Sequence, residues 1–204
     1  MEKNSLPCQT GMRRIFKNSS LLFLLAYFIS CTNGSRSDNH VYEFDVDGKH
    51  LKVYLERKGD SLNIIHADSY ADQKLILSDK WTLNFPAYHF ECADINRDGQ
   101  QDIFVGVIKP TRFDSVVRKR IFIFKLVDGY IRPLWLGARV GQPLEDFRIA
   151  HHNDENFVRT VEWEENGNFL VAEYRWKSFG LEFVNYLDRN ISKQEALKKL
   201  NTTP

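Results

Sequence analysis

Three Asp-Gly or Asn-Gly pairs, each flanked by runs of alternating apolar and polar residues, constrain the fold of this chain more than any other feature. Residues of this kind accept the positive φ angles that a tight type I′ turn between two antiparallel strands requires. The sequence therefore predicts antiparallel β-hairpins. The expected strand pairs are 41–46 with 51–55, 121–127 with 130–136, and 157–164 with 169–176, joined at Asp47-Gly48, Asp128-Gly129 and Asn166-Gly167.

Other segments add strands to these hairpins. Short strands are expected at 62–65 and from about Phe179 to Leu187. The run from Ile103 to Ile108 carries no polar side chain, which is typical of a central strand covered on both faces. In the C-terminal hairpins, alternation predicts which side chains face the core. The expected inward residues are Phe157, Val161, Trp163, Leu170, Ala172, Tyr174, Trp176, Phe179, Leu181 and Phe183.

One helix is predicted, close to the C-terminus. Ser192 and Glu195 form a capping box, in which each side chain satisfies a backbone N–H group that has no partner inside the helix. Ala196 and Leu200 supply a modest apolar stripe behind it. The helix is expected at about 193–200, and the fold class is all-β: an antiparallel meander of hairpins with one short C-terminal helix.

Composition limits the classes of protein to which the chain can belong. It has 204 residues, of which 43% are hydrophobic, so it can bury the core of one domain. Its net charge of +1 gives no reason to expect a nucleic-acid partner. Its three cysteines cannot build a dense disulfide scaffold.

The first thirty residues have the layout of a secretory signal. A basic stretch at Arg13, Arg14 and Lys17 precedes an apolar run over 21–29, and Ser30 and Cys31 follow. That run is too short for a transmembrane helix, which needs about 20 residues. The signal is therefore expected at 1–30, and Met12 is a second possible start because the basic residues then come first.

The end of this signal, Phe28-Ile29-Ser30-Cys31, resembles the lipobox of bacterial lipoproteins, with Phe28 where leucine is usual. The resemblance implies a protein cut before Cys31, lipidated on that cysteine and anchored in the cell envelope, at the outer membrane facing the periplasm. Residues 31–40 would then be the lipidated cysteine and a polar, flexible tether. A single β-rich domain is expected over 41–204. The alternatives are an uncleaved anchor, or an ordinary secretory signal in which Cys31 plays no part.

The strongest internal motif is a loop rich in oxygen ligands. Asp94, Asn96, Asp98 and Asp102 occupy positions 1, 3, 5 and 9 of this loop, and the carbonyl of Gln100 stands at position 7. Carboxylate, amide and carbonyl oxygens at this spacing suit Ca²⁺. The loop is not an EF-hand, because position 12 lacks the glutamate and a strand is expected to follow.

The stretch around this loop is similar to the calcium loop of FG-GAP and VCBS-type repeats, which form blades of β-propellers. The resemblance covers about Tyr88 to Leu136 and implies blade-like sheets, with Asp94, Asn96, Asp98, Gln100 and Asp102 as calcium ligands. The sequence holds no second intact copy, and a closed propeller of four or more blades would not fit its length. The alternative is a polar turn held by Asp and Asn side chains without metal.

The other polar clusters favour structural roles. Adjacent side chains on a strand point to opposite faces, so His151 and His152 are not expected to bind one metal ion. His89 and Glu91 are expected to form a surface pair. The basic run 118–120 is expected to protect the start of an apolar strand from edge association. Cys92 is expected to be buried and inert, on the same face as Tyr88 and Phe90.

Trp81, Trp135, Trp163 and Trp176 could form a sugar platform, but three of the four lie among inward-alternating or turn-adjacent apolar residues, which favours core packing. No sequence motif of a common catalytic site is present. The leading hypothesis is a non-catalytic envelope lipoprotein that binds an envelope protein or glycan. The alternatives are a polysaccharide-active hydrolase, which needs a carboxylate pair in a cleft, and a carbohydrate-binding module, which needs at least two coplanar exposed tryptophans.

Overall fold

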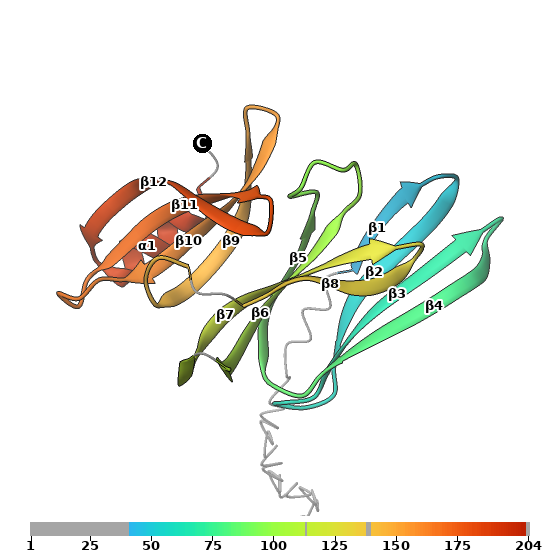
Figure 1. The fold of residues 1–204 in the computed structure, drawn as a ribbon, viewed down its shortest axis with the longest axis horizontal. Coiled ribbons are helices and arrows are strands. Elements are labelled where there is room, and N and C mark those ends of the chain that lie inside the picture. Colours follow the sequence, from blue (N-terminus) through green and yellow to red (C-terminus); the bar gives the residue numbers. More distant parts are fainter. Residues whose placement is uncertain (1–40, 113, 138–139, 203–204) are drawn as a thin grey trace, which may run out of the picture. The chain divides into compact units, whose positions relative to one another are not determined.

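The computed structural model describes residues 41–112, 114–137 and 140–202, all within one compact unit (Figure 1). The signal expected at 1–30, the lipidated Cys31 and the tether up to residue 40 lie outside the described residues. Twelve strands and one helix follow one another in the described part of the chain. They are β1 (Val41–Val46), β2 (Lys49–Arg57), β3 (Asn63–Ala71), β4 (Lys74–Leu83), β5 (Ala87–Ala93), β6 (Asp102–Thr111), β7 (Asp114–Val127), β8 (Tyr130–Leu136), β9 (Leu144–His152), β10 (Glu155–Trp163), β11 (Phe169–Lys177), β12 (Gly180–Ile191) and α1 (Lys193–Leu200). The predicted all-β class with one short C-terminal helix is confirmed.

The strands form two antiparallel sheets, one with the order β1-β2-β3-β4 and one with the order β12-β11-β10-β9-β7-β6-β5, to which β8 adds by pairing with β7. Within the larger sheet, the pairing of β7 with β9 consists of one residue pair, Lys119 with Leu144. The chain is therefore organised as three successive four-stranded meanders. We call β1–β4 the first meander, β5–β8 the second and β9–β12 the third.

The second meander shares one hydrophobic core with each of its neighbours. Its central strand β6 turns Ile103, Val105 and Val107 into the core formed with Leu51, Val53, Leu55 and Ile65 of the first meander. From the same strand, Phe104 packs into the core formed with Phe147 and Val158 of the third meander. All of these side chains are at most 6% exposed. The expectation that 103–108 is a central strand covered on both faces is confirmed.

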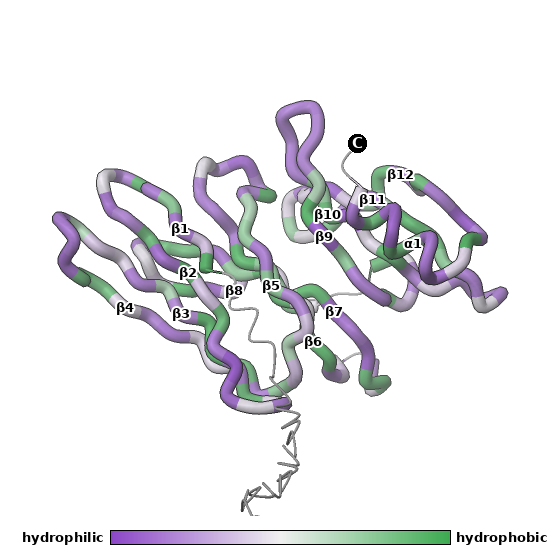
Figure 2. The backbone as a smooth tube through the Cα atoms, turned by 180° about the vertical axis from the view of Figure 1, so that it is seen from behind, coloured by the Kyte–Doolittle hydropathy of each residue, from purple (hydrophilic) through white to green (hydrophobic). Residues whose placement is uncertain are grey.

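The helix covers the remaining face of the third meander. Ala196 and Leu200 of α1 pack against Val161, Phe169 and Val171. At its start, the Ser192 hydroxyl accepts a hydrogen bond from the Glu195 backbone N–H at 3.3 Å, which is half of the predicted capping box. Figure 2 shows the hydrophobic stretches in the middle of the strands and the hydrophilic ones at the hairpin tips.

Two of the three predicted tight turns are present. Asp47 and Gly48 have φ angles of 50° and 74°, and Asp128 and Gly129 have 53° and 82°, as type I′ turns require. The third hairpin differs, because β10 ends at Trp163 and β11 begins at Phe169. Its five-residue connection is closed by a hydrogen bond from the Glu164 N–H to the Asn168 carbonyl, so Asn166-Gly167 sits inside a longer loop.

Three residues expected to face inward do not. Trp163 is 41% exposed, Phe179 93% and Phe183 44%. Strand β10 is covered on both faces, so alternation does not separate core from solvent there. Phe179 lies in the turn before β12, and β12 is an edge strand with several irregular pairings to β11, which shift its alternation.

A similar irregularity separates Tyr88 from Phe90 and Cys92. The pairing of β5 with β6 shifts between Ala87 and His89. As a result, Tyr88 packs in the core with the third meander, while Phe90 and Cys92 pack in the core with the first. Burial raises the pKa of the Cys92 thiol, which keeps it protonated and unreactive.

Candidate metal site

The loop between β5 and β6 is organised by the side chain of its first residue, Asp94. One carboxylate oxygen, Oδ1, accepts hydrogen bonds from the backbone N–H groups of Arg97 at 2.7 Å and Asp98 at 3.2 Å. The other, Oδ2, accepts one from the Gly99 N–H at 2.9 Å. Arg97 and Gly99 both have positive φ angles, 64° and 82°, so the chain turns sharply around the Asp94 carboxylate. Gly99 adopts this conformation without steric cost.

Asn96 and Asp98 close the middle of the same loop. Asn96 Oδ1 accepts a hydrogen bond from the Asp98 N–H at 3.0 Å, and Asn96 Nδ2 donates one to Asp98 Oδ2 at 2.9 Å. Asp98 Oδ1 accepts one from the Gln100 N–H at 2.9 Å. Each of these three oxygens, Asn96 Oδ1, Asp98 Oδ1 and Asp98 Oδ2, accepts one hydrogen bond and keeps a lone pair, because a carboxylate or amide oxygen can accept two.

Asp102, the last predicted ligand, is buried at the first position of β6. It is 1% exposed, and its Oδ2 accepts a hydrogen bond from the Ile95 N–H at 3.2 Å. The pKa of the Asp102 carboxyl is raised to about 7, chiefly by burial and to a smaller extent by the negative charges of Asp98 and Asp94, against backbone hydrogen bonds that lower it. A buried carboxylate beside two others is unfavourable unless a cation neutralises it.

The donor set fits a hard divalent cation. It offers three carboxylates, one amide oxygen and one backbone carbonyl, all of which are oxygen ligands of the kind Ca²⁺ prefers. Within residues 41–112, 114–137 and 140–202, however, no three His, Cys, Asp or Glu side chains are already gathered as a metal cluster. Because the loop oxygens engage backbone N–H groups, a metal-free polar turn explains the same geometry.

The loop contacts the third meander as well as the second. Asn156 Nδ2 of β10 donates a hydrogen bond to the Asp94 carbonyl at 2.7 Å. Arg97 reaches the Asp154 carbonyl at 3.4 Å and the Glu155 carboxylate at 3.8 Å. The sequence analysis did not find these partners, because about 60 residues separate them from the loop and nothing in the sequence pairs the two segments.

On its other side the loop reaches the first meander. Gln100 and Gln101 line a cavity together with residues of β1, β2 and β4. The loop of the second meander thus lies beside residues of both other meanders.

The histidine side chains contact polar groups on neighbouring strands. His151 and His152 do not converge: His151 contacts the Asn156 side chain at 3.0 Å, whereas His152 stacks on Phe157 and lies 3.3 Å from the Glu173 carboxylate. His89 and Glu91 do form the expected pair, with His89 Nε2 3.1 Å from the Glu91 carboxylate. The pair is more buried than expected, because its side chains are 15% and 20% exposed and the Arg148 side chain lies against both.

The basic run 118–120 lies inside β7, so it does not precede the strand as expected. Arg120 is 5% exposed and its guanidinium donates to the Asp114 carboxylate at 2.9 Å. Lys119 pairs with Glu145 of β9 at 2.8 Å. These cations serve intramolecular pairing across the strands.

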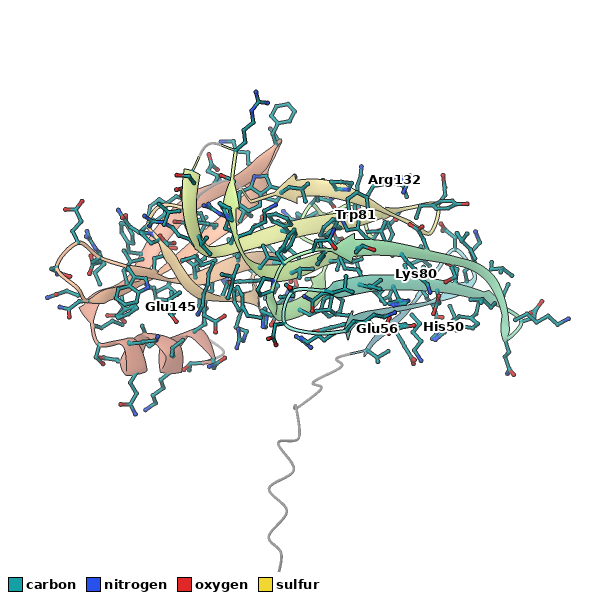
Figure 3. All side chains as sticks on the ribbon, turned by 90° about the horizontal axis from the view of Figure 1, so that it is seen from below. His50, Glu56, Lys80, Trp81, Arg132 and Glu145 are labelled. Carbon is teal, nitrogen blue, oxygen red and sulfur yellow. The ribbon has the colours of Figure 1, made fainter. Side chains whose placement is uncertain are left out.

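The tryptophans do not form a sugar-binding platform. Trp81, Trp135 and Trp176 are partly buried against the two large cores, as expected, and among the described residues Trp163 is the one exposed tryptophan. Figure 3 shows Trp81 on the side of the first meander that faces Arg132 of β8, away from His50 and Glu56.

No protein-family model, curated protein or solved structure matches the chain. Among the described residues, no helix has the length and apolar character needed to cross a bilayer. The function of the chain therefore has to be inferred from its own residues and geometry.

Proposed function

We propose that the protein is a lipid-anchored lipoprotein of the bacterial envelope, whose non-catalytic β domain binds an envelope protein or glycan and carries one calcium loop. The observation that supports the calcium site best is Asp102, a buried carboxylate placed beside Asp94 and Asp98, to which no cationic side chain in the described part of the chain is bonded. The support for the anchor is the lipobox-like sequence that ends at Cys31. Orientation toward the periplasm, at the outer membrane, is part of the same proposal.

In this proposal, Ca²⁺ is held by the side chains of Asp94, Asn96, Asp98 and Asp102 and by the Gln100 carbonyl. The ion neutralises the negative charge of the three carboxylates. Because the loop touches all three meanders, calcium bound there would stabilise the packing of the whole domain. The expected role is structural, and affinity is expected in the weak range of extracellular modules, about 10⁻⁴–10⁻³ M.

Thermal melting of the protein with and without calcium tests the site. Calcium at ten times its Kd should stabilise the folded state by roughly 1.4 kcal/mol, which raises the Tm by roughly 3–6 °C, and a chelator should reverse the change. Asp98→Ala should abolish this response. Asp60→Ala removes an exposed carboxylate from another turn and should leave it intact. A Tm that does not change with calcium up to about 10 mM, a concentration well above that affinity range, would show that the loop is a metal-free turn.

Acyl labelling in a bacterial host tests the anchor. Cys31→Ala should abolish incorporation of labelled fatty acid and leave unprocessed precursor or soluble protein. Cys92→Ala is the matched control, because that thiol lies in β5 and packs against a core. Continued labelling of the Cys31→Ala variant, or its presence in membranes at mature size, would refute the lipoprotein proposal.

A further inference from the structure

A cavity lies between the first and second meanders at the end where the β1–β2 and β7–β8 turns come together (Figure 1). Its volume is about 110 Å³. Apolar side chains drawn from both meanders form about half of its lining. They are Phe44, Val46, Leu51, Ile76, Leu77 and Leu126.

One polar group faces this apolar space from within. Ser69 of β3 lines the cavity and is 2% exposed, and its hydroxyl has no hydrogen-bond partner among the described residues. The hydroxyl points across to the second meander, since a Cβ built on Gly129 of the β7–β8 turn would lie 3.0 Å from Ser69 Oγ. The hydroxyl is not among the side-chain atoms of the described residues that are both fully buried and unpaired, so it stays accessible from the cavity and can form a hydrogen bond with a ligand there.

The mouth of the cavity carries neutral and oppositely charged groups. Gln100 and Gln101 of the β5–β6 loop border it with their amides, and Asp47, Lys49 and Asp128 stand at the rim. A charged ligand would meet both positive and negative side chains there, so neither an anion nor a cation is favoured. The chemistry therefore favours a neutral ligand.

We propose that this cavity binds a small neutral molecule with an apolar body, about as large as one aromatic ring, and a single hydrogen-bonding group that meets the Ser69 hydroxyl. Apolar cavities only slightly larger than this one bind benzene-sized molecules. The proposal does not rest on the calcium loop, although the loop supplies part of the mouth. It extends the proposed function from a structural domain to one that takes up a small amphipathic ligand.

The test uses benzyl alcohol and toluene, which differ by one hydroxyl group. Both are titrated into the protein, and binding is followed by the NMR shifts of leucine and isoleucine methyl groups that line the cavity. All titrations contain a chelator, so that failure of the calcium proposal leaves this result independent. Both compounds should bind saturably and shift the Leu77 and Leu126 methyl groups.

Ser69→Ala separates the polar contact from the apolar one. It should weaken benzyl alcohol binding roughly 3- to 10-fold, the effect of one neutral hydrogen bond, and leave toluene binding unchanged. Ser61→Ala, at an exposed position before β3, is the control and should change neither affinity.

A second variant fills the cavity. Val46→Phe places a ring in the space from partly buried β1 and should abolish binding of both compounds, while Val116→Phe, at the exposed far end of β7, should not. Three results would overturn the proposal: no saturable binding of either compound, equal effects of Ser69→Ala on both, or binding that survives Val46→Phe in a folded variant.

Discussion

At the residue scale, Asp102 has opposite consequences with and without a cation. The carboxylate is needed as a ligand, yet its burial beside Asp94 and Asp98 opposes the folded state when no ion is bound. An amide at this position would keep an oxygen for the hydrogen bond from the Ile95 N–H and remove the buried charge. The substitution should therefore raise stability in the absence of calcium and remove the stabilisation that calcium gives.

We expect Asp102→Asn to raise stability in chelator at neutral pH by about 1 kcal/mol or more, which is roughly 2–4 °C in Tm, because a buried charge without a countercharge is removed. The same variant should lose the stabilisation by calcium. Differential scanning calorimetry of wild type and variant in both conditions measures the two effects. A variant less stable than wild type in chelator would contradict the burial argument.

The loop residues are recognisable in the sequence, but part of what surrounds them in the fold is not. The spacing of Asp94, Asn96 and Asp98 is local, so it is visible in the sequence. The burial of Asp102 and the hydrogen bond from Asn156 depend on the packing of β10 against the loop. No local pattern encodes that packing.

At the scale of the elements, Glu145 of β9 joins three parts of the second and third meanders. Its carboxylate lies 2.8 Å from Lys119 of β7, 2.9 Å from Lys193 at the start of α1 and 3.1 Å from the Trp163 indole N–H. Burial alone would raise the pKa of Glu145, but the hydrogen bonds from the two lysines outweigh it and lower the pKa below 4.5.

Glu145→Gln should lower the unfolding free energy at pH 7 by about 1–3 kcal/mol, since two cations lose their charged partner. A lowered pKa means that this stabilisation is present above the ordinary value of 4.5 and is lost as the pH falls below it. The difference between wild type and variant in urea unfolding should therefore shrink between pH 5 and about pH 3. Glu165→Gln, at an exposed position, should show no difference at either pH. A difference in unfolding free energy between wild type and Glu145→Gln that stays constant with pH would contradict this role of the Glu145 carboxylate.

Elements marked by local chemistry were predicted well. Asp47-Gly48 and Asp128-Gly129 locate their turns because only a few residue types accept positive φ. The β3–β4 turn was missed because Asp72 and Gln73 both take positive φ there, which such residues rarely do. The burial of Trp163 and Phe179 was predicted wrongly. Alternation of apolar and polar residues shows which side chains face the core only where one side of a strand is solvent-exposed.

At the scale of the whole molecule, the second meander is the shared layer of both large cores. A residue on its central strand should therefore affect the stability of the entire domain. Phe104, 0% exposed, is such a residue, and Phe179, 93% exposed, provides a control of the same type.

Phe104→Ala should lower the unfolding free energy by about 3–5 kcal/mol, because a large side chain is removed from a packed core. Phe179→Ala should change it by less than about 0.5 kcal/mol. Both are measured by urea denaturation followed by tryptophan fluorescence. Equal effects of the two substitutions would show that the cores are not packed as described.

The stacking of three meanders could not be predicted from the sequence. The chain has no internal repeat that marks the three units, and the single pair between Lys119 and Leu144 is a join that no turn or alternation reveals. The hairpins follow from contacts between neighbouring strands. Which faces of the meanders pack together depends on side chains that are far apart in the sequence, such as Phe104 and Phe147, which share a core.

The simple strand order has a consequence for how the protein assembles. Apart from the single pair that joins β7 to β9, every strand pairs only with the strand before or after it in the chain. Short loop closures suffice for such pairings, so we expect faster folding than for sandwiches that pair distant strands. Each meander can form as soon as its own residues are available. A chain that emerges from a ribosome or a translocation pore N-terminus first can then build its layers in sequence, each on the one already formed.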